Sequence, residues 1–415
     1  MYKSAKIVIS SIIGNALENY DYILYVNFAF ILSQLFFPSE NLYVSLIATF
    51  GVFAAGFLMR PVGALIFGHI GDKYSRKKAL SISIILMSFP TTLIGCLPSY
   101  HDIGMLAPIL LVIIRLLQGI SIGGETSGFM TYLMEAMPNS KRKALIGSLA
   151  LTSTACGLFL GFLAVFIHNL FFAEISWAWR VPFLISFPIG MIGFYIRSRL
   201  EDGPEFTSLK ETGQLAEFPL KKLLQNHKKR LLIISGLFAS ISVQFYVFFA
   251  FLSNFLIKIL EYDALQISAI YLLSTVIFAS VAPISGLLSD RFGIFKVLLC
   301  AMLSFTILLF PIFYLIFSKD PALTLIGCIL FITSAALYQG SVPVVILKIF
   351  PTQVRAIGTA LSFNIISVIF GGLTPMFLTF LIKIGFSYYV VPIYLLVVFL
   401  GTISAIFIGN RNKLL

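Results

Sequence analysis

The stretch LLIISGLFASISVQFYVFFAFLSNFLIKIL, residues 231–260, contains a single charged side chain, Lys258. A helix that crosses the hydrocarbon core of a bilayer needs about 20 mostly apolar residues, so this stretch is long enough to span a membrane. Comparable stretches recur along the whole chain. They predict twelve membrane spans, at 7–37, 42–71, 79–97, 103–137, 145–171, 178–198, 231–260, 265–289, 294–318, 321–348, 355–383 and 387–409.

The composition of the 415 residues agrees with this interpretation. Hydrophobic residues make up 59% of the chain and charged residues 11%, whereas soluble domains carry about 25% charged residues. A soluble core cannot hide this much apolar surface, but a bilayer can. We therefore predict an all-α integral membrane protein with twelve transmembrane helices.

The positive charges are placed in a way that predicts topology. About 23 of the 29 Lys and Arg residues lie at the N-terminus, in alternate loops or at the C-terminus, and the net charge is +12. Loops on the cytoplasmic side of a membrane carry an excess of Lys and Arg. The pattern predicts a multi-pass protein with both termini in the cytoplasm, and it gives no reason to expect nucleic acid as a partner.

The two halves of the chain repeat one another. Three short sequences of the first half return in the second half in the same order, at offsets of about 218, 221 and 213 residues: Gly68…Asp72 as Gly286…Asp290, Gln118-Gly119 as Gln339-Gly340, and Pro138…Arg142 as Pro351…Arg355. Such self-similarity indicates a duplication. Two parallel six-helix halves with a site between them near the bilayer midplane form a transporter architecture.

A polar stretch separates the two halves. Residues 199–230 contain Pro204 soon after Asp202, which suits the first turn of a helix. We predict an N-terminal half over 1–200, a cytoplasmic linker with short amphipathic helices over 201–230, and a C-terminal half over 231–415.

Four stretches of the first half resemble a known family. They are Glu18-Asn19-Tyr20-Asp21-Tyr22, Arg60-Pro61-Val62-Gly63 running into Gly68…Arg76, Arg115…Gln118-Gly119 through Gly124-Glu125 to Arg142, and Trp179-Arg180-Val181-Pro182-Phe183 through Pro204-Glu205-Phe206. They resemble the metabolite:proton symporter family of the major facilitator superfamily, whose members carry proline and betaine, α-ketoglutarate, citrate or shikimate. The resemblance implies two pseudo-symmetric six-helix halves. Asn19 and Thr126 stand where the family has tryptophan, which is expected to alter the substrate pocket.

Five ionisable residues lie well inside predicted spans: Glu18, Asp21, Arg60, Arg115 and Glu125. A charged group in hydrocarbon costs about 2.5–3.5 kcal/mol on insertion scales, so each is a candidate functional residue. A rise of 1.5 Å per residue places Glu18, Arg60 and Glu125 roughly 16–20 Å from the cytoplasmic end of their helices, near the midplane. We expect these three to form one cluster. The alternative is a buried ion pair that only fixes helix packing.

The roles follow from this placement. Protonating an acid beside an arginine would release the arginine for the carboxylate of a substrate, so proton coupling is predicted for Glu18, Asp21 and Glu125. Substrate binding is predicted for Arg60 and Arg115, and for neutral residues whose alternative is helix packing: Asn15, Tyr22, Tyr25, Gln118, Gln244, Tyr338, Gln339 and Asn364.

Gating is predicted for residues near the cytoplasmic ends of the spans. By resemblance, Asp72 and Arg76 belong to a charge network that locks the two halves together, and an anion is favourable at a helix N-terminus. For the neighbouring Lys73, Lys77 and Lys78, a solvated basic loop is a sufficient explanation. The complete set is Gly68, Asp72, Arg76, Glu135, Arg142, Asp290, Arg291 and Arg355.

The sequence thus predicts a secondary active transporter that takes up a proton and a small polar metabolite together. Three acids and two arginines would be nearly neutral once one proton is bound, which favours a zwitterion such as proline or a betaine. The alternatives are a proton-coupled mono-, di- or tricarboxylate symporter, and an uncoupled facilitator or channel, which would not need the midplane carboxylates.

An enzyme is not predicted. The chain has no metal-binding cluster, no nucleophile elbow and no Walker loop. We expect no cofactor apart from the proton as the coupling ion. The expected partners are a small-molecule substrate and the lipid bilayer, with the protein acting as a monomer in a bacterial inner membrane.

Overall fold

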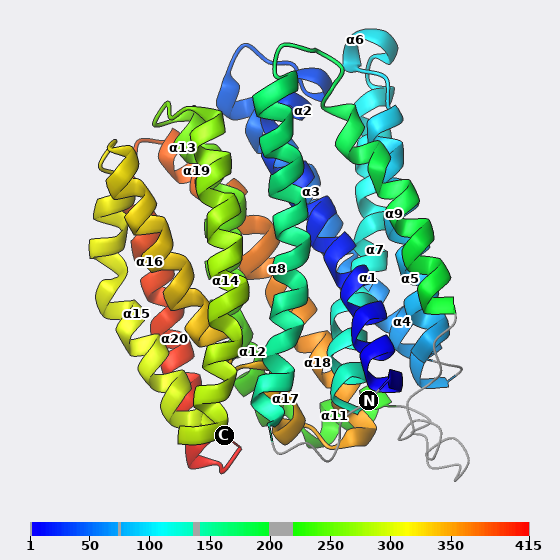
Figure 1. Cartoon of the computed structure of the whole chain (residues 1–415), viewed down its shortest axis with the longest axis vertical. Helices are drawn as coiled ribbons and strands as arrows, with labels where there is room; N and C mark the ends of the chain where they lie inside the picture. The colour runs from blue at the N-terminus through cyan, green and yellow to red at the C-terminus, as the bar shows by residue number, and fades with distance from the viewer. Residues whose placement is uncertain (1, 74–75, 136–141, 199–218, 415) are drawn as a thin grey trace.

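The computed structural model describes the backbone of residues 2–73, 76–135, 142–198 and 219–414 (Figure 1). Within these ranges the regular elements are helices, and they form twelve spans. Eleven of them are long and apolar enough to cross a membrane by the side chains that are described. The remaining one is the first span, in which the side chains of residues 2–14 are not described. The predicted fold class is confirmed.

The first six spans run up and down the bundle, and three of them consist of two segments. In chain order they are α1 (Tyr2–Asn27) with α2 (Ala29–Phe36), α3 (Leu42–Leu58) with α4 (Arg60–Lys73), α5 (Arg76–Cys96), α7 (Leu106–Glu135), α8 (Lys143–Ile167) with the π-helix η1 (His168–Phe172), and α9 (Arg180–Ser198). A four-residue helix, α6 (Tyr100–Ile103), lies between α5 and α7.

The second six spans repeat this plan. They are α12 (Lys228–Tyr246) with the π-helix η2 (Val247–Leu252) and α13 (Ser253–Lys258), α14 (Ala264–Phe292), α15 (Ile294–Ile316), α16 (Pro321–Gln339) with α17 (Pro343–Ile349), α18 (Thr352–Ser367) with the π-helix η3 (Val368–Gly372) and α19 (Leu373–Lys383), and α20 (Val390–Arg411). The short helix α11 (Pro219–Asn226) precedes them. The boundaries of the halves and linker stay a prediction, because residues 199–218 lie outside the described part.

Local chemistry explains where continuous predicted spans are interrupted. The span predicted over 103–137 starts later, at Leu106, because Gly104 adopts a positive φ of 60° that ends α6. The helix breaks at Met59, just before Pro61 in the first turn of α4, and again before Pro343 at the start of α17, because the first turn of a helix is where a proline is best tolerated.

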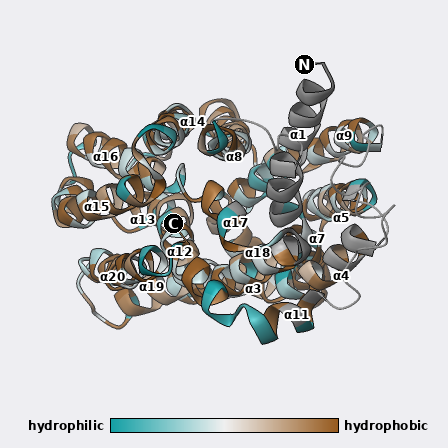
Figure 2. Ribbon diagram, turned by 90° about the horizontal axis from the view of Figure 1, so that it is seen from below, coloured by the Kyte–Doolittle hydropathy of each residue, from teal (hydrophilic) through white to brown (hydrophobic). Residues whose placement is uncertain are grey.

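Helices of the two halves pack on one another: α8 packs on α14, α3 packs on α19, and α18 packs on α4 and α7. Figure 1 shows α8 and α14 side by side, with both termini at the lower end of the bundle. From below, α17 and α18 lie near the centre, between the two groups of helices (Figure 2). The space enclosed by α1, α4, α8, α12, α16, α17 and α18 is where the candidate site lies.

Candidate functional site

A cavity lies between the two halves. It encloses about 690 Å³ of empty space, including the part that opens toward solvent. Among the described residues that line it, the charged ones are Glu18 of α1 and Arg60 of α4. Its other polar lining residues are Asn15, Asn19, Thr154, Ser242, Tyr246 and Gln339. The cavity therefore combines one acid, one base and several neutral hydrogen-bonding groups from both halves.

Arg60 is fixed in place by close helix packing. A Cβ atom at Gly123 of α7 would lie 2.0 Å from the carbonyl oxygen of Arg60, so only glycine lets α7 approach α4 this closely. The same holds for Gly119, where a Cβ atom would lie 1.8 Å from the carbonyl oxygen of Gly56. The close packing at these glycines fixes the position of α4 against α7, and with it the direction from which the Arg60 side chain enters the cavity.

The guanidinium of Arg60 is buried but has donors left over. Its Nη1 donates a long hydrogen bond of 3.4 Å to the hydroxyl of Tyr246, and its Cζ lies 3.7 Å from the centre of the Phe57 ring. Its Nε has no hydrogen-bond partner in the described part of the chain. An arginine carries five N–H donors and remains charged in proteins. Arg60 can therefore still bind a carboxylate, in the bidentate manner that guanidinium favours.

Aromatic rings form the wall beside Arg60. The ring of Tyr246 lies 5.2 Å from that of Phe57, 5.5 Å from that of Tyr22 and 5.2 Å from that of Phe245. Phe245 and Tyr246 line the cavity directly. Aromatic faces attract ammonium groups, including quaternary ones. This wall can hold the cationic end of a ligand whose carboxylate reaches Arg60.

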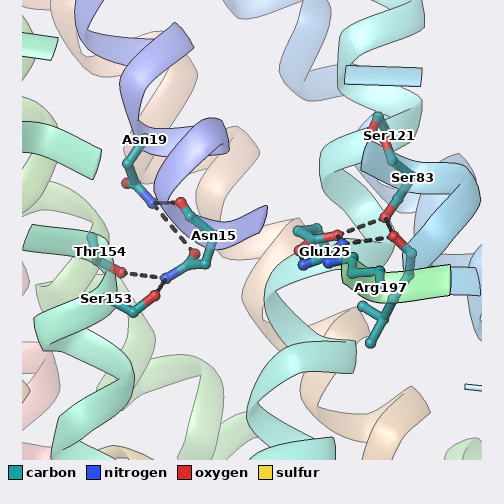
Figure 3. A network of polar contacts seen from close by, with 9 residues as sticks. Asn15, Asn19, Ser83, Ser121, Glu125, Ser153, Thr154 and Arg197 are labelled. Carbon is teal, nitrogen blue, oxygen red and sulfur yellow. Dashed lines mark hydrogen bonds and ion pairs between the residues drawn. The ribbon is translucent and has the colours of Figure 1, made fainter. Parts of the chain in front are cut away.

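Neutral amides tie α1 to α8 around Glu18. Asn15 donates to the hydroxyls of Ser153 and Thr154 at 2.8 and 3.0 Å, and Asn19 donates to the carbonyl oxygen of Asn15 at 2.7 Å (Figure 3). Glu18 lies on the same helix and lines both the main cavity and a smaller pocket that it shares with Glu125. Asn15 and Glu18 both line the main cavity.

Of the predicted cluster of Glu18, Arg60 and Glu125, the third member shares a small pocket with Glu18 but does not line the main cavity with Arg60. The carboxylate of Glu125 pairs with Arg197 of α9 through two hydrogen bonds, one of them 2.9 Å long, and accepts another of 2.6 Å from Ser83 (Figure 3). The rise per residue gives the depth of a side chain but not the direction in which it points. Arg197 was missed because a basic residue at the end of a span is already explained by topology.

A second buried ion pair holds the first half together away from the cavity. Arg115 lies 3.0 Å from Asp21, and Gln118 donates to the same carboxylate at 2.9 Å. The Tyr25 ring stacks 3.7 Å from the Cζ of Arg115, and its hydroxyl donates to the carbonyl oxygen of Thr49. These four residues, Asp21, Tyr25, Arg115 and Gln118, are not among the described lining of the cavity, and their predicted roles stay untested.

The predicted substrate-binding residues of the second half also fall into two groups, those that line the main cavity and those that do not. Gln339 lines the cavity and donates to Gln244, which is fully buried and whose Nε2 has no partner among the described residues. Tyr338 donates instead to the carbonyl oxygen of Leu237, and Asn364 donates across the halves to that of Gly123. Of the aromatic wall only Tyr22 was predicted, because a phenylalanine or tyrosine in a span looks like ordinary packing.

Asp290 makes a contact between the halves at the end that carries the termini. It lies in the last turn of α14, and its two carboxylate oxygens accept hydrogen bonds from the backbone N–H groups of Ala144 and Leu145, each at 3.0 Å. These N–H groups belong to the first turn of α8, where an anion is stabilised. Arg142 and Arg291 are exposed nearby in sequence. The side chains of Gly68, Asp72, Arg76, Glu135 and Arg355 lie outside the described part.

Asp290→Ala is expected to loosen this end of the molecule. A lost cap costs about 1 kcal/mol, which corresponds to a roughly fivefold shift between two states. Because α14 and α8 belong to different halves, the cavity should open more often toward the termini. The measurement is the rate at which a thiol reagent, added from that side, labels Ser242→Cys in a cysteine-free background.

Asp320→Ala is the matched control for that experiment. Asp320 accepts from the N–H groups of Ala322 and Leu323 at 2.8 and 3.0 Å, but both belong to the helix that it begins. Its loss should therefore leave the labelling rate unchanged. Equal rates in the two variants would show that the Asp290 contact does not hold the halves together.

Comparisons with known proteins agree with this geometry. The model of the Major Facilitator Superfamily matches residues 21–375. The glycine betaine/proline/ectoine/pipecolic acid transporter OusA of Dickeya dadantii is 32% identical over 98% of this chain and 84% of its own length. The proline/betaine transporter of Escherichia coli is 34% identical over 95% of this chain and 81% of its own length.

Solved structures show the same fold. The D-xylose–proton symporter superposes with a TM-score of 0.72 at 17% identity, covering 97% of this chain and 96% of that one. The partially occluded inward-open form of the xylose transporter XylE from E. coli gives a TM-score of 0.73 at 17% identity, covering 99% and 98%.

Proposed function

Because this chain belongs to the major facilitator superfamily, we propose that it is a secondary active transporter, not an enzyme, and that it carries a zwitterionic osmolyte such as proline or a betaine together with a proton. Transport proceeds by alternating access, in which the two halves rock around the cavity between them. The proton is the coupling ion, and no cofactor is needed.

The observation that carries this proposal is the pairing of one arginine with an aromatic wall. Arg60 provides donors for a carboxylate, and Phe245 and Tyr246 provide ring faces for an ammonium group. A zwitterion has these two ends and no net charge. A di- or tricarboxylate would require further cations, and Arg60 is the cation among the described lining residues. A carboxylate symporter is therefore the weaker alternative.

Glu18 supplies the proton coupling in this proposal. It is the acid among the described lining residues, and its charge stands in the same cavity as that of Arg60. When Glu18 is protonated, Arg60 has one competitor fewer for its donors, so the substrate carboxylate binds more tightly. When Glu18 releases its proton on the other side of the membrane, it again competes for Arg60, and the substrate carboxylate binds less tightly. An uncoupled facilitator would have no use for a buried carboxylate at this position.

The placement in the membrane follows from the charges. Both termini and α11, which follows the basic linker in the sequence, lie at one end of the bundle (Figure 1), and this end is proposed to be cytoplasmic in a bacterial inner membrane. The cavity is lined by residues of both halves of the chain, and a monomer is proposed as the functional unit.

Uptake of radiolabelled glycine betaine and proline by cells that lack their own osmolyte transporters tests the proposal. Cells expressing the protein should concentrate one or both substrates, and a protonophore should lower accumulation at least tenfold. Concentration of citrate or α-ketoglutarate, with no uptake of either zwitterion, would favour the carboxylate symporter. Equilibration of substrate without any response to the pH gradient would favour the facilitator.

A further inference from the structure

A second cavity lies between the halves at the end of the bundle opposite the termini. It encloses about 340 Å³ of empty space, including its open part. Helices of both halves contribute to it: the start of α3, the end of α13 and the end of α19. Most of its lining is apolar or aromatic, and Lys258 is its one charged side chain among the described residues. The lining includes Tyr43, Phe50, Phe251, Asn254 and Phe255.

The ammonium of Lys258 has an unusual environment for a charged group. The side chain is half-buried, and its Nζ lies 3.4 Å from the centre of the Phe30 ring. Within the described part of the chain, no carboxylate lies within ion-pair distance of it. A cation that is partly desolvated against a ring face gains from an added anion, because a charge-assisted hydrogen bond is stronger than a neutral contact.

The same segment closes this end of the molecule. Asn254 of α13 donates to the carbonyl oxygen of Val26 in α1 at 2.8 Å, and Lys258 contacts Phe30 in α2 one turn further along. Both contacts cross from the second half to the first span. Along the chain, η2 alone separates α13 from Tyr246, which lines the main cavity.

We propose that this second cavity, here called the outer site, receives the substrate before it reaches the main cavity. Lys258 binds the substrate carboxylate, and the surrounding rings contact the methylated or aliphatic part. In doing so Lys258 leaves Phe30, so substrate binding removes one of the two contacts by which α13 closes the bundle. The ligand class is the zwitterion of the proposed function, on which this inference rests.

Lys258→Met tests the outer site, since methionine keeps the length and apolar contacts of the side chain without its charge. Uptake of glycine betaine is measured in intact cells, and uptake from the opposite side is measured in inverted membrane vesicles. We expect the KM from the side opposite the termini to rise about tenfold, with a maximal rate within twofold of the wild type. The KM from the side of the termini should not change. Lys258→Arg should restore the wild-type KM.

Lys383→Met is the matched control, because Lys383 lies exposed at the end of α19 on the same side of the molecule. It should behave as the wild type. An unchanged KM in Lys258→Met, or an equal rise on both sides, would overturn the outer site while leaving the proposed function intact. Failure of the wild-type protein itself to transport either zwitterion would overturn the proposed function, and the outer site with it.

Discussion

Glu18→Gln is expected to abolish proton-driven accumulation of substrate, lowering the accumulation ratio about 100-fold, while exchange of labelled for unlabelled substrate continues. Glutamine has the size and hydrogen-bonding capacity of a protonated glutamate but cannot lose a proton. The main cavity would therefore bind substrate and reorient, yet return without releasing a proton. The measurement compares accumulation under an imposed pH gradient with counterflow exchange in the same proteoliposomes.

Glu125→Gln provides an informative comparison, because Glu125 was also predicted to couple protons. Its carboxylate accepts hydrogen bonds from Arg197 and Ser83. Breaking a buried ion pair by removing one partner costs about 3–5 kcal/mol of folding stability. We therefore expect Glu125→Gln to reduce the amount of folded protein, and the double variant Glu125→Gln/Arg197→Gln to regain stability and coupling. A folded double variant that exchanges but does not accumulate substrate would assign proton coupling to Glu125. Accumulation by Glu18→Gln would exclude Glu18.

Arg60→Lys is expected to weaken substrate binding by about 10–100-fold, the range that corresponds to a charged hydrogen bond of about 1.5–3 kcal/mol. Lysine keeps the charge but not the planar fork that binds a carboxylate through two parallel hydrogen bonds. It also loses the flat contact with the Phe57 ring. The measurement is the affinity of purified, folded protein for glycine betaine by calorimetry.

Arg115→Lys serves as the control for Arg60→Lys. Arg115 is equally buried in the first half, but it pairs with Asp21 and is stacked on Tyr25 rather than lining the main cavity. Its replacement should lower thermal stability and leave affinity within about threefold of the wild type. An unchanged affinity in Arg60→Lys, or a larger loss in Arg115→Lys, would move the carboxylate site from Arg60 to Arg115.

The order of the spans could be predicted from the sequence, whereas the direction in which a side chain points from its helix could not. The number and order of the spans follow from apolar length, and the duplicated halves follow from the echo of Gly68…Asp72 in Gly286…Asp290. Glu18 and Arg60 were placed correctly in one cavity. Glu125 shares a small pocket with Glu18, but its carboxylate binds Ser83 of α5 and Arg197 of α9. Arg197 is more than 70 residues further along the chain, so no local pattern predicts this pair.

For the aromatic residues, prediction from the sequence is limited for a different reason. The chain contains 42 phenylalanines and 17 tyrosines, and nothing in their spacing distinguishes Tyr246 from those that only pack. Its position beside Arg60 depends on η3, where a Cβ atom at Gly371 would lie 2.6 Å from the Tyr246 ring. That contact joins spans 7 and 11, and no sequence pattern within either span predicts it.

The two halves differ in how their helices are held. The first half is braced by two ion pairs that cross between its helices, Asp21 with Arg115 and Glu125 with Arg197. Its described part contains one π-helix, η1, at the end of span 5, whereas the second half contains two, η2 and η3, in the middle of spans 7 and 11. π-Helical turns are rare and are frequently found at functional sites. When the halves rock, we therefore expect the ion-paired first half to move as a rigid unit and bending to concentrate at η2 and η3.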